Sequence, residues 1–414
     1  MTQKQPFQRR LIRRRRSAAL VAVLGLVATM AATTTGGANA AAKPKAGSDT
    51  RMFRQVNLVS DIPGMAMLTD PEVKNPWGIA FGPKKTPTPL WVNNQFNPAS
   101  AVPGIPAPED LLTKITLYAG ANGVTPIAKV PLEVQASSPT GIVFNPTSDF
   151  VINQAGTDTP ARFLFNEIFV NDAGTAPEGR ITGWSNVPAP APTTTSTDAR
   201  MDGQFSTGLA LVPRHNGVPA HLLAVNGFSG DPVVHEFDTH FADVTKPGSF
   251  VDPTISSEGM IPYNVMFLKG KVYVTYFTGP GQGGGAISVF TRRGKFLQQL
   301  VTGDPLNAPW GMAISPKGWN GFGRALIVGN VDNGMINAFG LKTGRFRGTL
   351  KDADGNPFVN IGLWGIAFGN GVIGTPRSLI FAAGIGVTPD SFDEVYEHGL
   401  VGLIEPLNRH DEVS

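Results

Sequence analysis

The chain alternates short apolar runs with polar, Gly-rich and Pro-rich segments, and one apolar phrase recurs. Its clearest copies are NPWGIAFG at 75–82, APWGMAI at 308–314 and LWGIAFG at 363–369. Weaker copies begin at 139, 206 and 262, and the equivalent positions are 78, 141, 208, 264, 311 and 365. A repeat of roughly 50 residues that opens with a short apolar strand predicts a β-propeller or another repeat array.

Alternating positions after each copy predict three more strands in a repeat. The cleanest repeat has them at 271–277, 285–290 and 296–300, whereas the last has only 378–382 and 399–404. An alternating segment at 53–60 precedes the first repeat and has no partner of its own. We therefore predict that this N-terminal strand pairs into the last blade, because closing the ring removes two exposed sheet edges.

The predicted fold is all-β, a single six-bladed propeller over 53–407 with blades starting near 75, 138, 206, 262, 307 and 362. A lead-in at 41–52 precedes it and a tail at 408–414 follows it. The alternative is a seven-bladed ring with one blade misread in the two long first repeats. The composition, with 49 Gly and 35 Pro, suits strands and turns better than helices.

Two segments within the long repeats are predicted to be loops. The first is a Pro-rich insertion at 97–110, and the second is a Pro/Thr/Ala run at 188–197. Such low-complexity composition is typical of exposed, irregular chain. Both are therefore expected at the surface.

The first 40 residues have the order of a secretory signal peptide. Lys4 and six arginines precede an apolar run at 17–32, and small residues allow cleavage near Ala40. The run is short for a membrane span. We expect a secreted or cell-envelope protein with no membrane span after cleavage, and a retained anchor is the alternative. The Arg9-Arg10 pair leaves both the Sec and the twin-arginine routes open.

Removal of this leader reverses the net charge. Residues 1–40 hold seven of the 34 Lys and Arg and none of the 31 Asp and Glu, so the formal charge changes from +3 to −4. We therefore expect no nucleic-acid partner. The chain contains no cysteine, which excludes disulfides, thiolate metal sites and a Cys nucleophile.

Several phrases resemble a known protein family. They are NLVSD at 57–61, NPWGIAFGP at 75–83, PTGIVFNP at 139–146, LNAPWGMAISP at 306–316, GLWGIAFGNG at 362–371 and HGLVGLIEP at 398–406. Together they resemble an uncharacterised family of exported bacterial NHL-like six-bladed β-propellers, some of which carry a PEP-CTERM sorting tail. The resemblance implies the same fold over 53–407 and no established activity. This chain departs from it in having no apolar tail after Pro406.

Residues at the starts of inner strands and the ends of second strands are predicted to surround one mouth of the propeller channel. Aromatic faces stack on apolar ring surfaces and amides fix orientation, so this set favours a small-molecule or sugar site. The same residue types also suit packing between blades and turn formation. The candidate ligand-binding residues are Trp77, Tyr263, Asn264, Trp310, Trp364, Asn93, Asn226 and Asn330.

Candidates for catalysis and metal binding are fewer. Glu167, Asn264, Asn330 and Asp332 carry oxygen ligands suited to Ca²⁺, although one or two acids are few for a divalent site. His398 is the acid–base candidate, and Glu167 and Asp332 are the other catalytic candidates. No other cofactor is evident from the sequence.

The sequence favours a binding or interaction module, a monomer whose partner is a small molecule, a glycan or a protein. One alternative is a lactonase-like hydrolase or lyase at the channel mouth, with or without Ca²⁺. Another is a structural surface protein whose mouth is filled by the Pro-rich loops. Convergent carboxylates or histidines would favour the enzyme, whereas aromatics and amides alone favour the binder.

Overall fold

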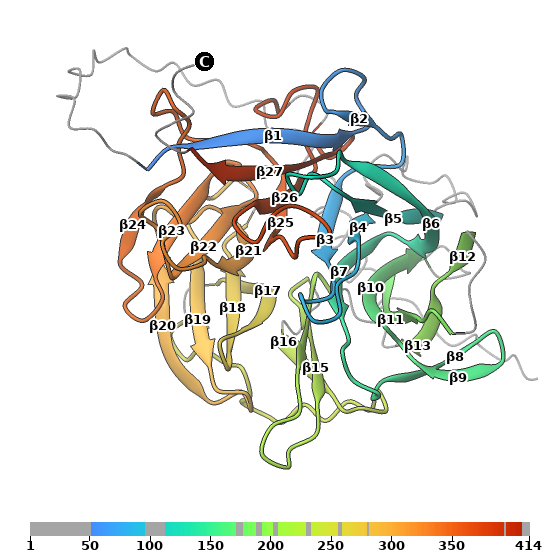
Figure 1. The fold of residues 1–414 in the computed structure, drawn as a ribbon. Helices are drawn as coiled ribbons and strands as arrows, with labels where there is room; N and C mark the ends of the chain where they lie inside the picture. The colour runs from blue at the N-terminus through green and yellow to red at the C-terminus, as the bar shows by residue number, and fades with distance from the viewer. Residues whose placement is uncertain are drawn as a thin grey trace, which may run out of the picture.

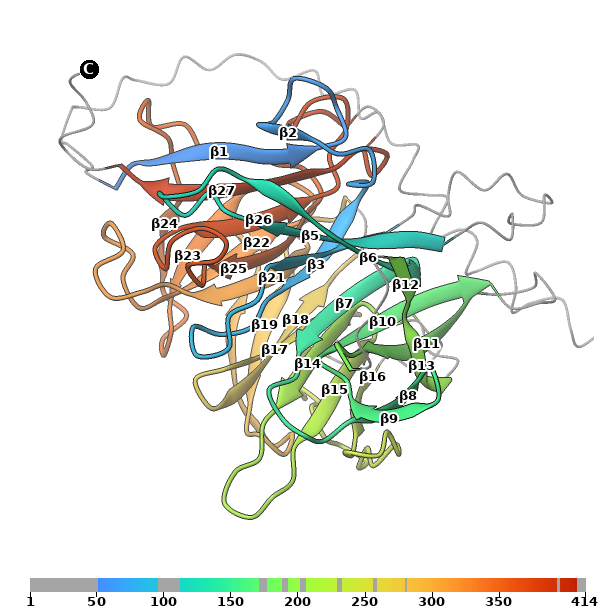
Figure 2. The same ribbon diagram turned by 45° about the vertical axis from the view of Figure 1, so that its right-hand side comes forward.

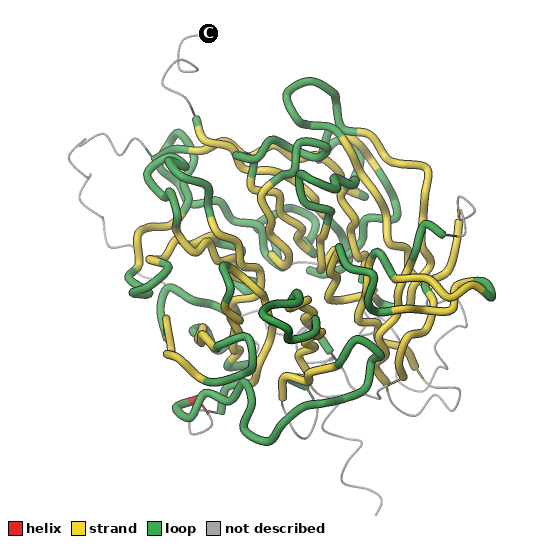
Figure 3. Tube along the Cα trace, turned by 60° about the horizontal axis from the view of Figure 1, so that its bottom comes forward, coloured by secondary structure: helices red, strands yellow, loops and turns green. Residues whose placement is uncertain are grey.

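The computed structural model describes residues 51–95, 112–170, 177–187, 193–201, 206–228, 233–255, 259–279, 281–392 and 395–407. Figure 1 shows their sheets arranged around a central axis as a six-bladed β-propeller. Strand and loop account for nearly all of the tube in Figure 3. Among these residues, no helix has the length and apolar character to cross a membrane. The predicted signal segment and the loop at 97–110 lie outside the described residues.

Each blade is an antiparallel sheet whose innermost strand carries the recurring phrase. The first blade contains β3 (Pro76–Ala80), β4 (Leu90–Asn94), β5 (Leu112–Ala119) and β6 (Ala128–Ser137), and the second contains β7 (Pro139–Phe144), β10 (Phe163–Val170), β11 (Pro177–Trp184) and β13 (Thr197–Met201). The third contains β14 (Gly208–Val212), β15 (His221–Asn226) and β16 (Val233–Phe237), and the fourth contains β17 (Ile261–Leu268), β18 (Lys271–Phe277), β19 (Ala286–Phe290) and β20 (Phe296–Thr302). The fifth contains β21 (Pro309–Ile314), β22 (Ala325–Asn330), β23 (Ile336–Gly340) and β24 (Phe346–Thr349), and the sixth contains β25 (Leu363–Phe368), β26 (Leu379–Ala383) and β27 (Leu400–Pro406). A hairpin of β8 (Val151–Gln154) and β9 (Thr157–Pro160) is inserted in the second blade.

The N-terminal strand closes the ring, as the sequence predicted. Strand β1 (Phe53–Ser60) pairs antiparallel with β27, in a register that places Phe53 opposite Pro406 and Ser60 opposite Leu400. Figures 1 and 2 show β1 lying along β27 on the outside of the last blade. A short strand, β2 (Leu68–Thr69), pairs parallel to β1 at the outer edge. The last sheet therefore joins both ends of the propeller.

The glycine of the recurring phrase is explained by close approach of neighbouring inner strands. A Cβ added at Gly78, Gly141 or Gly311 would come within 3.0 Å of the backbone of the next inner strand. At Gly365 it would come equally close to the carbonyl oxygen of Trp77, so the sixth inner strand contacts the first. Only glycine leaves room for this contact.

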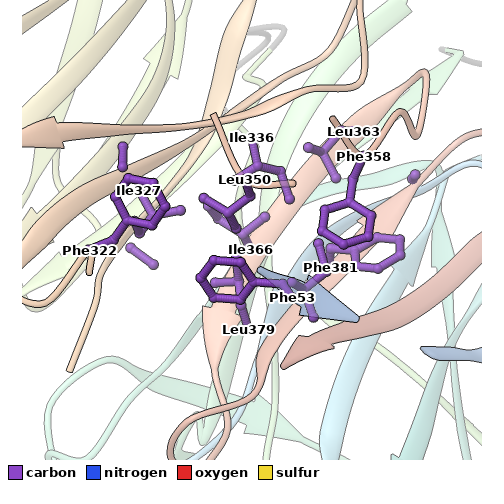
Figure 4. Close-up of a cluster of buried hydrophobic side chains, with 14 of the residues drawn as sticks. Phe53, Phe322, Ile327, Ile336, Leu350, Phe358, Leu363, Ile366, Leu379 and Phe381 are labelled. Carbon is purple, nitrogen blue, oxygen red and sulfur yellow. The ribbon is translucent and has the colours of Figure 1, made fainter. Parts of the chain in front are cut away.

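The hydrophobic core lies between neighbouring sheets. Figure 4 shows one cluster in which Phe53, from β1, packs among side chains of the fifth and sixth blades. The ring of Phe53 is fully buried, with its centroid 4.7 Å from that of Trp319 and 6.1 Å from that of Phe322. The closing strand is therefore part of the core as well as of the sheet.

The prediction of a loop at 188–197 is wrong for 193–195, although Thr195 is exposed as expected. Residues Thr193–Thr195 form β12, which pairs parallel with β6 of the first blade. Ser196 follows and is buried. Threonine is β-branched and suits a strand, and a neighbouring sheet edge provides the partner that composition alone does not reveal. Residues 188–192 lie outside the described residues.

Candidate functional site

The four predicted aromatic residues meet in one buried cluster. Trp77, Tyr263, Trp310 and Trp364 belong to one cluster, although they come from the inner strands of four different blades. The rings of Trp77 and Trp364 stack with centroids 3.8 Å apart, and those of Trp310 and Tyr263 lie 5.9 and 6.0 Å from that of Trp364. The sequence pattern thus located a real convergence of side chains.

These rings are mostly buried against one another. Their exposed fractions are only 3% to 8%. The Nε1 atoms of Trp77 and Trp364 both donate to Oδ1 of Asn75, at 3.1 and 3.2 Å. The Trp77–Trp364 stack is therefore a packed part of this cluster, and we call it the aromatic floor.

Trp310 differs from the other two tryptophans in its hydrogen bonding. Its Nε1 is buried and finds no acceptor in the described part of the chain. A buried donor without a partner costs roughly 1–3 kcal/mol, and such groups are rare in folded proteins. This indole N–H is therefore suited to donate to a bound molecule.

A carboxylate, Asp332, lies near Tyr263 of this cluster, on the loop that follows β22. It accepts a hydrogen bond from the backbone N of Gly281 at 3.2 Å. Burial raises the pKa of Asp332, and this hydrogen bond only partly opposes that effect. No basic side chain in the described ranges forms an ion pair with it. Asp332 is thus a partly buried acid without a basic partner among the described residues.

Two tyrosines face the same region. Burial raises the pKa of both Tyr263 and Tyr396, and the negative charge of Asp332 raises both further. Tyr263 also interacts electrostatically with Tyr396, so the three groups lie close enough to influence one another. Asp332 and Tyr396 are partly exposed, whereas Tyr263 is buried. The acid and one phenol thus form a rim that solvent reaches.

Tyr396 is the functional candidate that sequence analysis missed. It lies on the loop between β26 and β27, which has no hydrophobic period to reveal its position. Its φ is +71°, a left-handed conformation that is rare for an aromatic residue, and its N donates to the carbonyl of Gly384 at 3.1 Å. Backbone strain of this kind occurs preferentially at functional sites. The sequence offers one signal for Tyr396: in a propeller, the loop between the second and third strands of a blade lies on the mouth face, and Tyr396 belongs to that loop of the last blade.

Two of the predicted asparagines, Asn93 and Asn264, link neighbouring blades, and so does Asn166, which the sequence analysis did not single out. Asn93 donates from Nδ2 to Thr140 O at 3.1 Å, Asn166 to Gly208 O at 2.9 Å and Asn264 to Trp310 O at 2.8 Å. In each case the acceptor belongs to the inner strand of the next blade. Asn330 donates to Pro305 O at 2.9 Å, and Asn226 is buried at the end of β15. Asn93 and Asn264 therefore hold neighbouring blades together at their inner strands.

The buried carboxylate of Glu167 is surrounded by hydrogen-bond donors from neighbouring strands and by one arginine. Its carboxylate is 1% exposed and accepts hydrogen bonds from Ser137 N (2.9 Å), Thr182 Oγ1 (2.6 Å) and Ser196 Oγ (2.5 Å). Arg180 completes the set with a salt bridge of 2.8 Å. The structure gives Glu167 these partners and places Asp332 with the tyrosines. Within the described ranges, no group of three or more His, Asp or Glu residues is arranged to hold a metal ion.

His398 pairs with a carboxylate that the sequence did not single out. Its Nδ1 lies 2.8 Å from Oδ2 of Asp61, whose side chain is 5% exposed. The other oxygen of Asp61 accepts from Gly399 N at 2.9 Å. The carbonyl of His398 accepts from Asn75 N at 3.1 Å, which places this pair on the mouth face. The pair exists only because β1 ends beside the start of β27.

Comparison with known proteins identifies relatives that are themselves uncharacterised. Two proteins of Acanthamoeba polyphaga mimivirus are 26% identical over 324 residues and 24% identical over 318 residues. The first alignment covers 75% of this chain and 72% of the relative, and the second covers 75% and 77%. No protein-family model matches the chain. The expected six-bladed propeller fold is confirmed, and the relatives are uncharacterised as expected. These two relatives are viral, whereas the resemblance implied bacterial ones.

Two solved structures with a similar shape are remote in sequence. A glucose dehydrogenase aligns with a TM-score of 0.46 at 12% identity, covering 80% of this chain and 96% of the other. A periplasmic gluconolactonase of Pseudomonas aeruginosa aligns with a TM-score of 0.41 at 15% identity, covering 74% and 77%. At these values the likenesses carry no argument about activity, so function must be argued from the residues of this chain.

Proposed function

We propose that this protein is a small-ligand-binding module whose site is the channel mouth formed by Asp332, Tyr263, Tyr396 and Trp310. One observation carries the proposal. The Asp332 carboxylate lies in a partly buried, aromatic setting with no basic partner among the described residues. An uncompensated charge costs stability, so a fold that keeps one gains from a ligand that neutralises it.

The chemistry of this mouth favours an organic cation. The faces of Trp, Tyr and Phe attract positive charge through their quadrupoles, and Asp332 supplies a formal counter-charge. The two phenols and the unpartnered Nε1 of Trp310 add hydrogen-bonding groups. We therefore propose a small amine or quaternary ammonium compound as the ligand class, bound beside the aromatic floor.

The setting of this module follows from the sequence. We propose that residues 1–40 direct export, that the module acts as a monomer outside the cytoplasm, and that it takes no nucleic-acid partner. A glycan and a partner protein are the competing ligands at the mouth. These two are distinguished from a cation by the experiment below.

The proposal predicts that choline stabilises residues 41–414 and that Asp332→Asn abolishes this effect. A ligand at a hundredfold excess over its Kd stabilises a protein by about 2.7 kcal/mol, which a thermal-shift titration detects readily. Asn keeps the shape of Asp and removes its charge. The matched control is Asp354→Asn, which removes the same charge from an exposed turn and should leave the choline response unchanged.

The ligand panel decides between the candidates. The neutral carbon isostere of choline should give a much smaller shift than choline if charge is recognised. A response to neutral sugars alone, equal in wild type and Asp332→Asn, would overturn the cation proposal in favour of a glycan. A response to none of these small molecules would leave a partner protein as the better explanation.

A hydrolase or lyase at the same mouth is the second candidate, and the His398–Asp61 pair favours it. Asp61 fixes the orientation of the imidazole, as a carboxylate does for a general base. Turnover of a lactone panel, lost in His398→Asn and retained in the exposed control His240→Asn, would support this candidate over simple binding.

A further inference from the structure

A second feature lies on the face opposite the channel mouth, between the third and fourth blades. It is a pocket of about 430 Å³. Its walls come from the loop after β14, the turn between β17 and β18, and the turn between β19 and β20. Because inner strands start at the mouth, these connections all open on the other face. Its volume is in the range typical of small-molecule sites.

The lining of this pocket is strongly basic. Lys271, Arg292 and Arg293 line it together with His215 and His221, and no Asp or Glu belongs to the lining. None of the three Lys and Arg side chains forms an ion pair with an acid in the part of the chain that the structure describes. One lining histidine does have an acid beside it: the carboxylate of Glu236 lies 3.8 Å from Nε2 of His221. The pocket therefore concentrates positive charge on one small concave surface.

Arg292 is held in place at the centre of this basic set. Its guanidinium lies 4.7 Å from the ring centroid of Phe267, and its Nη2 donates to the carbonyl of Pro213. Its own carbonyl lies 2.9 Å from Nε2 of His221. Burial lowers the pKa of Arg292, as expected for a cation that is partly removed from water without a counter-ion. The remaining guanidinium N–H groups are thus pre-oriented for an acceptor.

Apolar walls accompany the basic groups. Pro213, Val218, Pro219 and Leu297 also line the pocket, and Leu297 is 44% exposed despite its size. Exposed apolar surface beside convergent cations suits a ligand with a charged end and an apolar body. An inorganic ion would contact the basic side chains and leave the apolar walls unused.

We infer that this pocket binds a small organic dianion, such as a phosphate monoester, with the anionic group on Lys271, Arg292 and Arg293 and the apolar part against Val218 and Leu297. Arginine is well suited to this role because its planar fork matches the oxygens of phosphate. A dianion fits better than a monoanion, since three cationic side chains lack an acidic partner. The site is separate from the channel mouth and does not depend on the ligand proposed there.

Phenyl phosphate is the probe, measured by isothermal titration calorimetry against residues 41–414 at constant ionic strength. We expect binding that inorganic phosphate reproduces only weakly and that phenol does not reproduce. The double variant Lys271→Gln/Arg293→Gln should weaken binding at least tenfold, because it removes two of the three charges. It leaves Arg292 and its structural contacts in place, so the fold is preserved.

The control variant is Lys317→Gln, which removes an exposed positive charge on another blade and should bind phenyl phosphate like wild type. Two results would overturn the inference. One is phenyl phosphate binding no more tightly than inorganic phosphate, which would remove the organic ligand. The other is equal affinity in the double variant and wild type, which would place any binding elsewhere.

Discussion

Phe53→Ala is expected to lower the free energy of unfolding by about 3–5 kcal/mol, the usual cost of truncating a fully buried phenylalanine. Phe53 is 0% exposed and packs against Trp319 and Phe322, while its backbone N donates to Lys351 O at 2.9 Å. The substitution therefore loosens the contact between the closing strand and the fifth blade. Chemical denaturation of residues 41–414 measures it.

Arg54→Ala provides the matched control on the same strand. Its side chain is 58% exposed and forms a 2.9 Å ion pair with Glu405, so its loss should cost less than about 1 kcal/mol. Equal stability of Phe53→Ala and Arg54→Ala would contradict ring closure through the core. The difference between the two variants separates burial from mere pairing of β1 with β27.

Glu167→Gln is expected to lower the free energy of unfolding by about 1.5–3 kcal/mol, because it removes the buried charge that accepts this network's hydrogen bonds, although Arg180 keeps its 3.0 Å ion pair with Asp198. The carboxylate takes hydrogen bonds from Ser137 N, Thr182 and Ser196 in addition to the 2.8 Å salt bridge from Arg180. A neutral amide accepts through one oxygen only, so part of this network is lost. Thermal or denaturant unfolding gives the value.

The control for Glu167→Gln is Asp198→Asn, because both acids contact the same arginine. Asp198 lies 3.0 Å from Arg180 but its side chain is 55% exposed, so its loss should change stability by less than about 1 kcal/mol. If Glu167→Gln were as stable as wild type, the carboxylate would not be needed for folding. It would then return as a candidate for catalysis or metal binding.

The architecture could be predicted from sequence because each blade repeats one local physical requirement. Glycine must recur where inner strands touch, as at Gly78 and Gly311, and that spacing is visible without any structure. The closing strand could be predicted because it does not repeat: it is an extra strand outside the repeats. An alternating segment such as 53–60 cannot remain unpaired, and the last repeat lacked one strand.

The candidate site was only partly predictable, because its residues come from loops whose ends meet through long-range pairing. Tyr396 and Asp61 carry no periodic signal, and each reaches the mouth face through the sixth blade. Glu167 shows the opposite limit. Its place near the end of an apolar run resembles that of a site residue, but it lies within β10, and Arg180, directly across from it on β11, neutralises its charge.

The aromatic set illustrates how one pattern can serve two roles. Trp77 and Trp364 stack and share Asn75 as a hydrogen-bond acceptor, which makes them packing residues of the aromatic floor. Trp310 comes from the same sequence phrase, but its Nε1 has no hydrogen-bond partner among the residues that the structure describes. The sequence cannot separate them, because the difference depends on where the neighbouring loops place their acceptors.

The most direct test of the uncompensated carboxylate at the mouth is the stability of wild type and Asp332→Asn across pH, since it requires no knowledge of the ligand. The raised pKa of Asp332 means that folding favours its protonated form. The stability that protonated Asp332 contributes to the fold is therefore fully present below its usual pKa of 3.8 and is lost as the pH rises through the raised pKa. Asp332→Asn should be more stable than wild type at pH 7, on the order of 1 kcal/mol or less because the site is partly exposed, and equal at low pH. A variant that is less stable than wild type at pH 7 would contradict the proposed site.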